Sequence, residues 1–142
     1  MSTNQVSTPH QVSTLLQRFA LDPWNTGDLD GLDETTGEGY VLRGEPGQGD
    51  GTLQDLKDTI ATYRSAFPDL TMTVEETIAQ DERLAYRWTM RGTHRGDFEG
   101  IAPTGRAVTF RGITIVHLCD GEVVEDRYES SSPSTQQQLT GS

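Results

Sequence analysis

The sequence contains little cysteine and few basic residues, which zinc sites, disulfides and nucleic-acid contacts usually require. It has one cysteine, Cys119, and one lysine, Lys57, and its 11 basic residues are outnumbered by 22 acidic ones, giving a formal charge of −11. A lone cysteine excludes an internal disulfide and a multi-cysteine zinc site. The negative charge disfavours nucleic acid and anionic membranes as partners. We expect Cys119 to be a small buried residue of a strand.

Long hydrophobic runs are missing as well. No apolar stretch approaches the roughly 18 to 20 residues that cross a bilayer, and the start, Met1 to Gln5, has neither the basic residues nor the apolar stretch of a secretion signal. A chain of 142 residues has the length of one domain. We therefore expect a single-domain cytoplasmic protein that does not associate with membranes.

Histidine is scarce, and its spacing does not suggest a metal site. The three histidines are His10, His94 and His117, and none has a second histidine four residues away or a carboxylate at ligand spacing. We expect no metal. His10 should lie on the surface, His94 should bond to backbone in a turn, and His117 should face outward from its strand or contact another subunit.

Helical signals fill the first half of the chain. Thr8, Pro9 and Gln11 have the order of a capping box with proline in the first turn, so a helix should begin there and be ended or kinked by Pro23. A shorter element with two leucines, a segment ending at residue 42 and a glycine-rich loop at 44–51 follow. Thr52 should cap a second long helix, because apolar residues recur every three or four positions until Pro68.

The second half alternates apolar and polar residues, which is typical of strands with one buried face. Asp120-Gly121 is a strong hairpin signal, since glycine accepts a positive φ. The predicted strands are 69–79, 83–94, 106–119 and 122–130. Residues 1–7 and 130–142 are polar and lack periodicity, so we expect two mobile tails around a domain at 8–129. Helices followed by an antiparallel meander predict an α+β fold.

Several motifs together resemble one family. They are Trp24-Asn25-x-Gly27-Asp28, Ala66-Phe67-Pro68-Asp69-Leu70, the long segment from Gly92-Thr93-His94 to Thr104-Gly105-Arg106, and Asp120-Gly121-Glu122. In this order they resemble the SnoaL-like polyketide cyclase (ester cyclase) family over residues 12 to 129. The resemblance implies the cone-shaped nuclear-transport-factor-2-like fold, in which helices and a curved, mostly antiparallel sheet enclose a pocket.

The resemblance also implies cofactor-free chemistry, in which an aromatic polyketide closes a ring by intramolecular aldol condensation. A carboxyl group shielded from water can exchange the necessary protons, because burial moves its pKa towards neutrality. In the family this group is an aspartate on the last strand, in a Glu-His-Trp-Asp motif. Here Glu125-Asp126-Arg127-Tyr128 stands in its place, and Thr114 occupies the site of a second histidine.

Because of these departures from the family motif, the predicted catalytic residues of this chain differ from those of the family. Strand alternation places Val124, Asp126 and Tyr128 on one face, so we predict Asp126 and Tyr128 as the catalytic pair, with the Tyr128 phenol as a hydrogen-bond donor. A cone cannot fill its own mouth, so some aromatic residues should line a cavity for an apolar or polycarbonyl ligand. The predicted binding residues are Trp24, Tyr40, Trp88, Phe110 and Thr114.

Two other functions remain open at this point. An isomerase or a hydrolase could use the same cone, although an epoxide hydrolase needs an Asp-Arg-Asp arrangement and the central strand reads Tyr86-Arg87-Trp88-Thr89. A non-catalytic pocket protein that binds a small molecule is the other alternative. The arginines of the outer sheet face, such as Arg87 and Arg111, should pair with the surplus acids. That face could also form the contact of a homodimer or a larger homo-oligomer.

Overall fold

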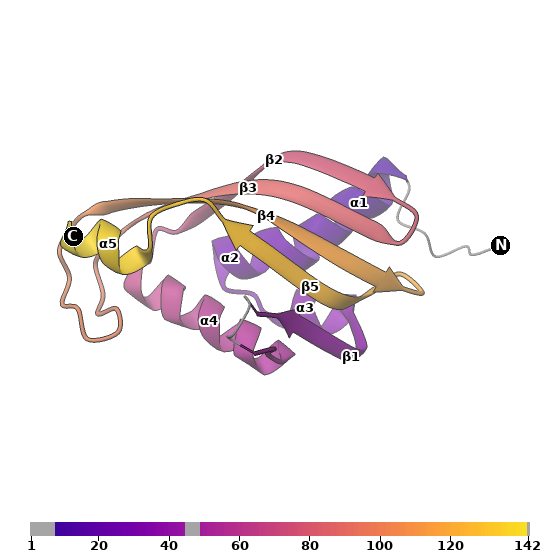
Figure 1. Ribbon diagram of the computed structural model, residues 1–142, viewed down its shortest axis with the longest axis horizontal. Coiled ribbons are helices and arrows are strands. Elements are labelled where there is room, and N and C mark those ends of the chain that lie inside the picture. The colour runs from indigo at the N-terminus through magenta and orange to yellow at the C-terminus, as the bar shows by residue number, and fades with distance from the viewer. Residues whose placement is uncertain (1–7, 45–48, 142) are drawn as a thin grey trace.

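The computed structural model describes residues 8–44 and 49–141 (Figure 1). The predicted tail at 1–7 and part of the glycine-rich loop lie outside these residues. The elements in chain order are α1 (Pro9–Leu16), the π-helix η1 (Gln17–Leu21), α2 (Asp22–Thr26), α3 (Asp30–Thr35), β1 (Thr36–Arg43), α4 (Leu53–Ala66), β2 (Thr71–Gln80), β3 (Arg83–Thr93), β4 (Ala107–Cys119), β5 (Glu122–Ser130) and α5 (Thr135–Thr140).

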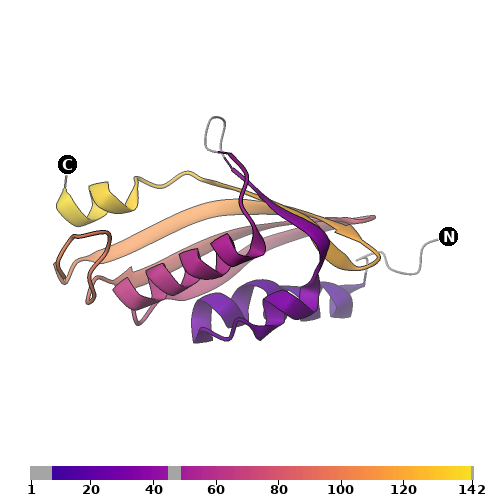
Figure 2. The same ribbon diagram turned by 90° about the horizontal axis from the view of Figure 1, so that it is seen from below.

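One mixed sheet carries the fold. Its strand order is β1-β5-β4-β3-β2, and all neighbours are antiparallel except β1 and β5, which run parallel. Figure 2 shows α1 to α4 on one face of this curved sheet. The α+β prediction is confirmed, and the four predicted strands are β2 to β5. In the described part of the chain, no helix is long and apolar enough to cross a membrane.

Capping residues set the helix starts, as predicted. Thr8 and Gln11 form one capping box, and Thr52 and Asp55 form another at the start of α4. Pro23 does not end the helical stretch, which continues past it to Thr26 and ends at Gly27. The turn before Pro23 is a π-helix. Pro23 itself lies in the first turn of α2, where a proline is tolerated, so the chain remains helical.

The two faces of the sheet differ in burial. The face towards the helices carries the core, with Leu84, Trp88, Met90, Phe110 and Val116 buried. The opposite face exposes Ile78, Ile113 and Ile115. There Arg87 makes an ion pair with Glu76 (Nε to Oε1, 3.4 Å). The expected subunit contact on this face remains a prediction.

Two sequence predictions near the C-terminus are corrected by the structure. The predicted tail at 130–142 instead contains α5, in which Thr135 and Leu139 are buried one helical turn apart. Gln138 fixes this segment, because its side-chain amide exchanges two hydrogen bonds with the Thr109 backbone, at 2.8 and 2.9 Å. Cys119 is exposed rather than buried, because it is the last residue of β4 and alternates with buried Leu118.

Candidate active site

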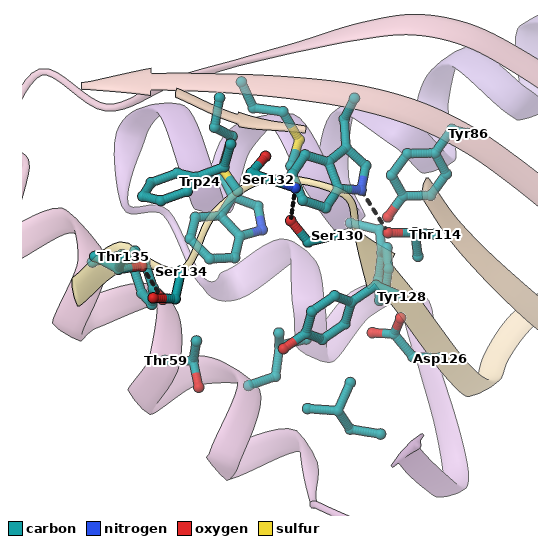
Figure 3. Close-up of a pocket in the computed structure, with 18 of the residues that line it drawn as sticks. Trp24, Thr59, Tyr86, Thr114, Asp126, Tyr128, Ser130, Ser132, Ser134 and Thr135 are labelled. Atoms are coloured by element: carbon teal, nitrogen blue, oxygen red, sulfur yellow. Dashed lines mark hydrogen bonds between the residues drawn. The ribbon is translucent and has the colours of Figure 1, made fainter. Parts of the chain in front are cut away.

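A cavity of about 420 Å³ lies between the sheet and the helices (Figure 3). This volume suits a small organic molecule. The helices contribute Phe19, Trp24, Leu56, Thr59 and Tyr63, the strands contribute Leu42, Met72, Tyr86, Trp88, Met90, Phe110, Thr114, Asp126 and Tyr128, and the C-terminal segment contributes Ser130, Ser132, Pro133, Ser134 and Thr135. The wall is therefore mainly apolar and aromatic.

Asp126 is the one acidic side chain among the described residues that line this cavity. It lies on β5 and is 4% exposed. Burial raises the pKa of Asp126 to about 6, whereas the hydrogen bond from Tyr40 acts in the opposite direction. A carboxyl group with this pKa can both take up and release a proton near neutral pH, which is what general acid–base chemistry requires.

A β-bulge in β5 determines which side chains reach the cavity. Asp126 pairs with Val116 and Tyr128 pairs with Thr114, but the register shifts before Leu118, which pairs with Val123. Asp126 and Tyr128 therefore share the inner face, as predicted. Val124 does not share it, because the extra residue of the bulge places Val123 in the core instead.

The phenol that bonds to Asp126 is Tyr40, which donates to Oδ2 at 2.7 Å. Tyr40 comes from β1, where the parallel pairing places Leu42 opposite Asp126. Tyr40 is not among the residues that line the cavity, and its phenol holds the carboxyl group. Its predicted contact with a ligand remains a prediction. Tyr128 does line the cavity and is 47% exposed. Its predicted role as a hydrogen-bond donor remains a prediction.

The other four predicted binding residues, Trp24, Trp88, Phe110 and Thr114, line the cavity. Trp88 donates from Nε1 to Oγ1 of Thr114 at 2.9 Å. Gly112 makes room for the indole, since a Cβ atom at this position would lie 2.5 Å from Cζ2 of Trp88. Contact of these four residues with a ligand remains a prediction.

Sequence reasoning did not select Tyr86 or a second group, a run of serines, among the residues that line the cavity. Tyr86 belongs to the inward alternation of β3 and lines the cavity, but it was not among the predicted binding residues. We call Tyr40, Tyr86, Thr114 and Asp126 the acid cluster. The second group, which we call the serine rim, is Ser130, Ser132 and Ser134. A run of serines in a polar segment gives no local signal of a cavity wall.

The histidines lie outside the cavity wall. His94 is fully buried, and its Nδ1 accepts a hydrogen bond from the backbone N–H of Thr104 at 3.0 Å, as the turn prediction required. His10 is exposed, also as predicted, and His117 is half-buried on β4. Within residues 8–44 and 49–141, no three His, Cys, Asp or Glu side chains gather as a metal site would require.

Two comparisons with known proteins agree with this architecture. The model of the SnoaL-like polyketide cyclase family matches residues 14–139. No curated protein matched the sequence. The family match ends within α5, at residue 139, and so extends beyond the boundary at residue 129 that the sequence motifs suggested.

Several solved protein structures are similar to this chain in both fold and sequence. AclR of Streptomyces galilaeus, a proposed hydroxylase, is 27% identical, with a TM-score of 0.82 over 96% of this chain and 84% of that chain. IdmH of Streptomyces antibioticus, a proposed polyketide cyclase, is 26% identical, with a TM-score of 0.73 over 93% of this chain and 97% of that one. TsrD of Streptomyces laurentii is 24% identical, with a TM-score of 0.80 over 96% and 99% of the two chains, which shows the shared fold.

Proposed function

Because the chain belongs to the SnoaL-like polyketide cyclase family, we propose that it closes a ring in a polyketide-like substrate by cofactor-free acid–base catalysis. One observation carries the proposal. Asp126 is a buried carboxyl group in an apolar cavity, and its pKa is raised to about 6. The size of the cavity and its aromatic wall suit a flat polycarbonyl molecule.

The proposed reaction is an intramolecular aldol addition. The Asp126 carboxylate removes a proton from a carbon atom next to one carbonyl group, which leaves an enolate. The enolate carbon then forms a bond to the carbon of a second carbonyl group in the same molecule, whose oxygen becomes an alkoxide. Asp126 returns the proton to that oxygen, so the enzyme ends in its starting state.

Tyr40 acts as a positioning residue in this scheme. Its single hydrogen is donated to Oδ2 of Asp126, which fixes the orientation of the carboxyl group. Burial and the charge of Asp126 raise the pKa of Tyr40 well above its ordinary value, so the phenol keeps its hydrogen. The other carboxylate oxygen, Oδ1, is then the atom that exchanges the proton.

The test uses a phenyl-substituted 1,5-diketone, which gains ultraviolet absorbance when it cyclises and loses water. Asp126→Asn should lower the rate by about 10² to 10⁴-fold, the usual contribution of a general base. The wild-type rate should fall as the pH drops below about 6, where Asp126 becomes protonated. Glu125→Gln is the matched control, because Glu125 is the adjacent carboxylate and makes an ion pair with Arg43 outside the cavity.

Two results would count against this function. An Asp126→Asn variant that keeps the wild-type rate would show that Asp126 is not the base. A wild-type protein that binds the diketone without accelerating its cyclisation would instead support a non-catalytic binding protein.

A hydroxylase is the second candidate, favoured by the similarity to AclR. Hydroxylation needs an oxidant such as molecular oxygen and adds an oxygen atom to the substrate, whereas an aldol addition leaves the atomic composition unchanged. The mass of the product formed by the wild-type protein therefore distinguishes the two candidates.

A further inference from the structure

Asp126 is a buried acid that has no basic partner in the part of the chain that the structure describes. Its neighbour in the sequence, Glu125, makes ion pairs with Arg43 at 3.1 Å and with Arg127 at 3.9 Å. Asp126 takes part in none of the ion pairs among the described residues, although its exposure is only 4%. The more exposed acid is therefore paired, and the buried one is not.

The cavity supplies no positive charge to Asp126 either. Among the described residues that line it, there is no lysine, arginine or histidine. The hydrogen bond that the carboxyl group makes is to Tyr40, which donates to Oδ2 at 2.7 Å. A carboxylate buried without a positive charge is costly. A ligand that carries a cation would therefore supply what the described protein residues do not.

The titratable groups around the carboxyl group are phenols. Tyr40 reaches it from β1 and Tyr86 lies on β3, while Tyr128 is two positions away on β5. On β4, the residue paired with Asp126 is the apolar Val116. Burial, and after it the charge of Asp126, raise the pKa of Tyr40 and of Tyr86 well above their ordinary values. Both phenols are therefore neutral between pH 5 and pH 8, where Asp126 changes its charge.

The wall around Asp126 also suits a cation. Seven aromatic side chains line the cavity, among them Trp24, Trp88 and Tyr128, and aromatic rings attract a cation that lies over their faces. Figure 3 shows Trp24, Tyr86 and Tyr128 around the same cavity as Asp126. The formal charge of the chain is −11, which raises the concentration of cations near its surface.

From this arrangement we infer that the cavity binds a flat hydrophobic molecule that carries a protonated amine, with Asp126 as its counterion. The ammonium group donates to the carboxylate, and the hydrocarbon part packs against the aromatic wall. Tyr40 is a positioning residue for this contact, because its bond to Oδ2 fixes the carboxylate.

Such an amine is also an inhibitor of the proposed cyclisation. It holds Asp126 in the ionised form and occupies the carboxylate that would otherwise take up the substrate proton. The inhibition rests on the proposed function, whereas the binding of the amine does not. The two can therefore be tested separately.

The experiment compares two ligands of similar shape and different charge. The probes are 2-aminotetralin, a bicyclic amine that is protonated between pH 5 and pH 8, and 2-tetralol, in which a neutral hydroxyl group replaces the amine. Tryptophan fluorescence reports binding, because Trp24 and Trp88, the two tryptophans of the chain, both line the cavity. At pH 8 the amine should bind about 10- to 100-fold more tightly than the alcohol, the usual effect of a hydrogen bond to a charged group.

The preference for the amine should depend on the ionisation of Asp126. The amine binds the carboxylate, and in the free protein burial raises the pKa of this group to about 6. The Kd of 2-aminotetralin should therefore increase about tenfold between pH 8 and pH 5, because most of the free protein is protonated at the lower pH. The Kd of 2-tetralol should be nearly independent of pH.

Two variants locate the counterion. Asp126→Asn should abolish both the preference for the amine and its pH dependence, while continued binding of 2-tetralol shows that the cavity is intact. Glu125→Gln is the matched control and should keep both properties. It removes the adjacent carboxylate, which pairs with Arg43 outside the cavity, and it changes the net charge by the same amount.

The inference is overturned if wild type binds 2-tetralol as tightly as the amine at pH 8, if Asp126→Asn keeps the preference, or if Glu125→Gln loses it. The cyclisation rate of the diketone gives a separate answer. A protein that prefers the amine through Asp126 but does not cyclise the diketone supports the inference and refutes the cyclase function. A protein that cyclises the diketone without preferring the amine refutes the inference alone.

Discussion

The serine rim and three members of the acid cluster, Tyr86, Thr114 and Asp126, line the same cavity, but the two groups are built in different ways. The members of the acid cluster come from β1, β3, β4 and β5, and side chains bond to side chains, as Tyr40 does to Asp126. The serine rim comes from one short segment, and Ser130 and Ser132 bond to the backbone of Arg111.

This contrast has a consequence for substitution. A bond between two side chains depends on both residue types, so each change in the acid cluster alters its chemistry. A bond to backbone needs only one side chain and fixes the path of the chain. We therefore expect the acid cluster to determine reactivity and global stability, and the serine rim to determine the shape and local opening of the entrance.

The largest effect should come from overpacking the wall beside the acid cluster. In Gly112→Val, the new Cβ atom would lie 2.5 Å from both the Trp88 ring and the Glu129 carbonyl oxygen. We expect a loss of about 3 kcal/mol in unfolding free energy, at the upper end for overpacking. Urea denaturation measures this loss. Ile113→Val, at the exposed neighbouring position, should change stability by less than about 0.5 kcal/mol, and an equal loss in both variants would contradict the prediction.

A smaller effect, with a defined sign, concerns the charge of Asp126. Its folded pKa of about 6 lies above the unfolded value of about 3.9, so the folded state binds the proton more tightly. The contribution of Asp126 to the stability of wild type should therefore rise as the pH falls from 8 through 6 towards 4. At pH 8 the folded state carries the free-energy cost of a buried negative charge at Asp126, and Asp126→Asn removes that cost. The variant should therefore be more stable than wild type by roughly 2 kcal/mol at pH 8, and the difference should vanish near pH 4.

Asp69→Asn provides the control of opposite sign. Hydrogen bonds from Thr93 lower the pKa of Asp69, so its carboxylate stabilises the fold at neutral pH and this contribution is lost on acidification. Urea denaturation curves of wild type and both variants at pH 8 and pH 4 measure these differences in unfolding free energy. If Asp126→Asn were less stable than wild type at pH 8, the interpretation of Asp126 as a costly buried charge would be wrong.

The smallest effect should appear at the serine rim. Ser134 caps α5 and forms a capping box with Gln137. Ser134→Ala should cost about 1 kcal/mol, confined to this helix. Amide hydrogen exchange should then accelerate at Gln137, while the amide of Thr114 in β4 keeps its protection. Gln136→Ala leaves the capping box intact and serves as the control. Faster exchange throughout the sheet would show that the rim and the acid cluster are one cooperative unit.

Local signals were sufficient for most of the fold. The capping box at Thr52, the stop before Pro68 and the alternation in the strands each depend on residues within a few positions. Hydrophobic periodicity did not predict the C-terminal helix α5. Only Thr135 and Leu139 are buried in it, and two residues one helical turn apart do not form a recognisable periodic pattern.

The site was harder to predict, because its contacts are not local. Alternation and family likeness identified Asp126 and placed Trp88 and Thr114 on the inner face. The Tyr40 bond depends on the parallel pairing of β1 with β5, which no short-range pattern encodes. Tyr86 is buried on the inward face of β3 like its core neighbours, so no local pattern marks it as a cavity residue.

The pairing of β1 with β5 also bears on how the molecule folds. Tyr40 and Asp126 are 86 positions apart in the chain, so their bond can form only after a long loop has closed. Such distant pairings are entropically expensive and tend to form late in folding. Until β1 docks, Asp126 lacks the Tyr40 bond and part of its cover. The raised pKa of Asp126 is therefore a property of the finished tertiary structure, and its appearance during refolding would time the arrival of the sheet's edge strand.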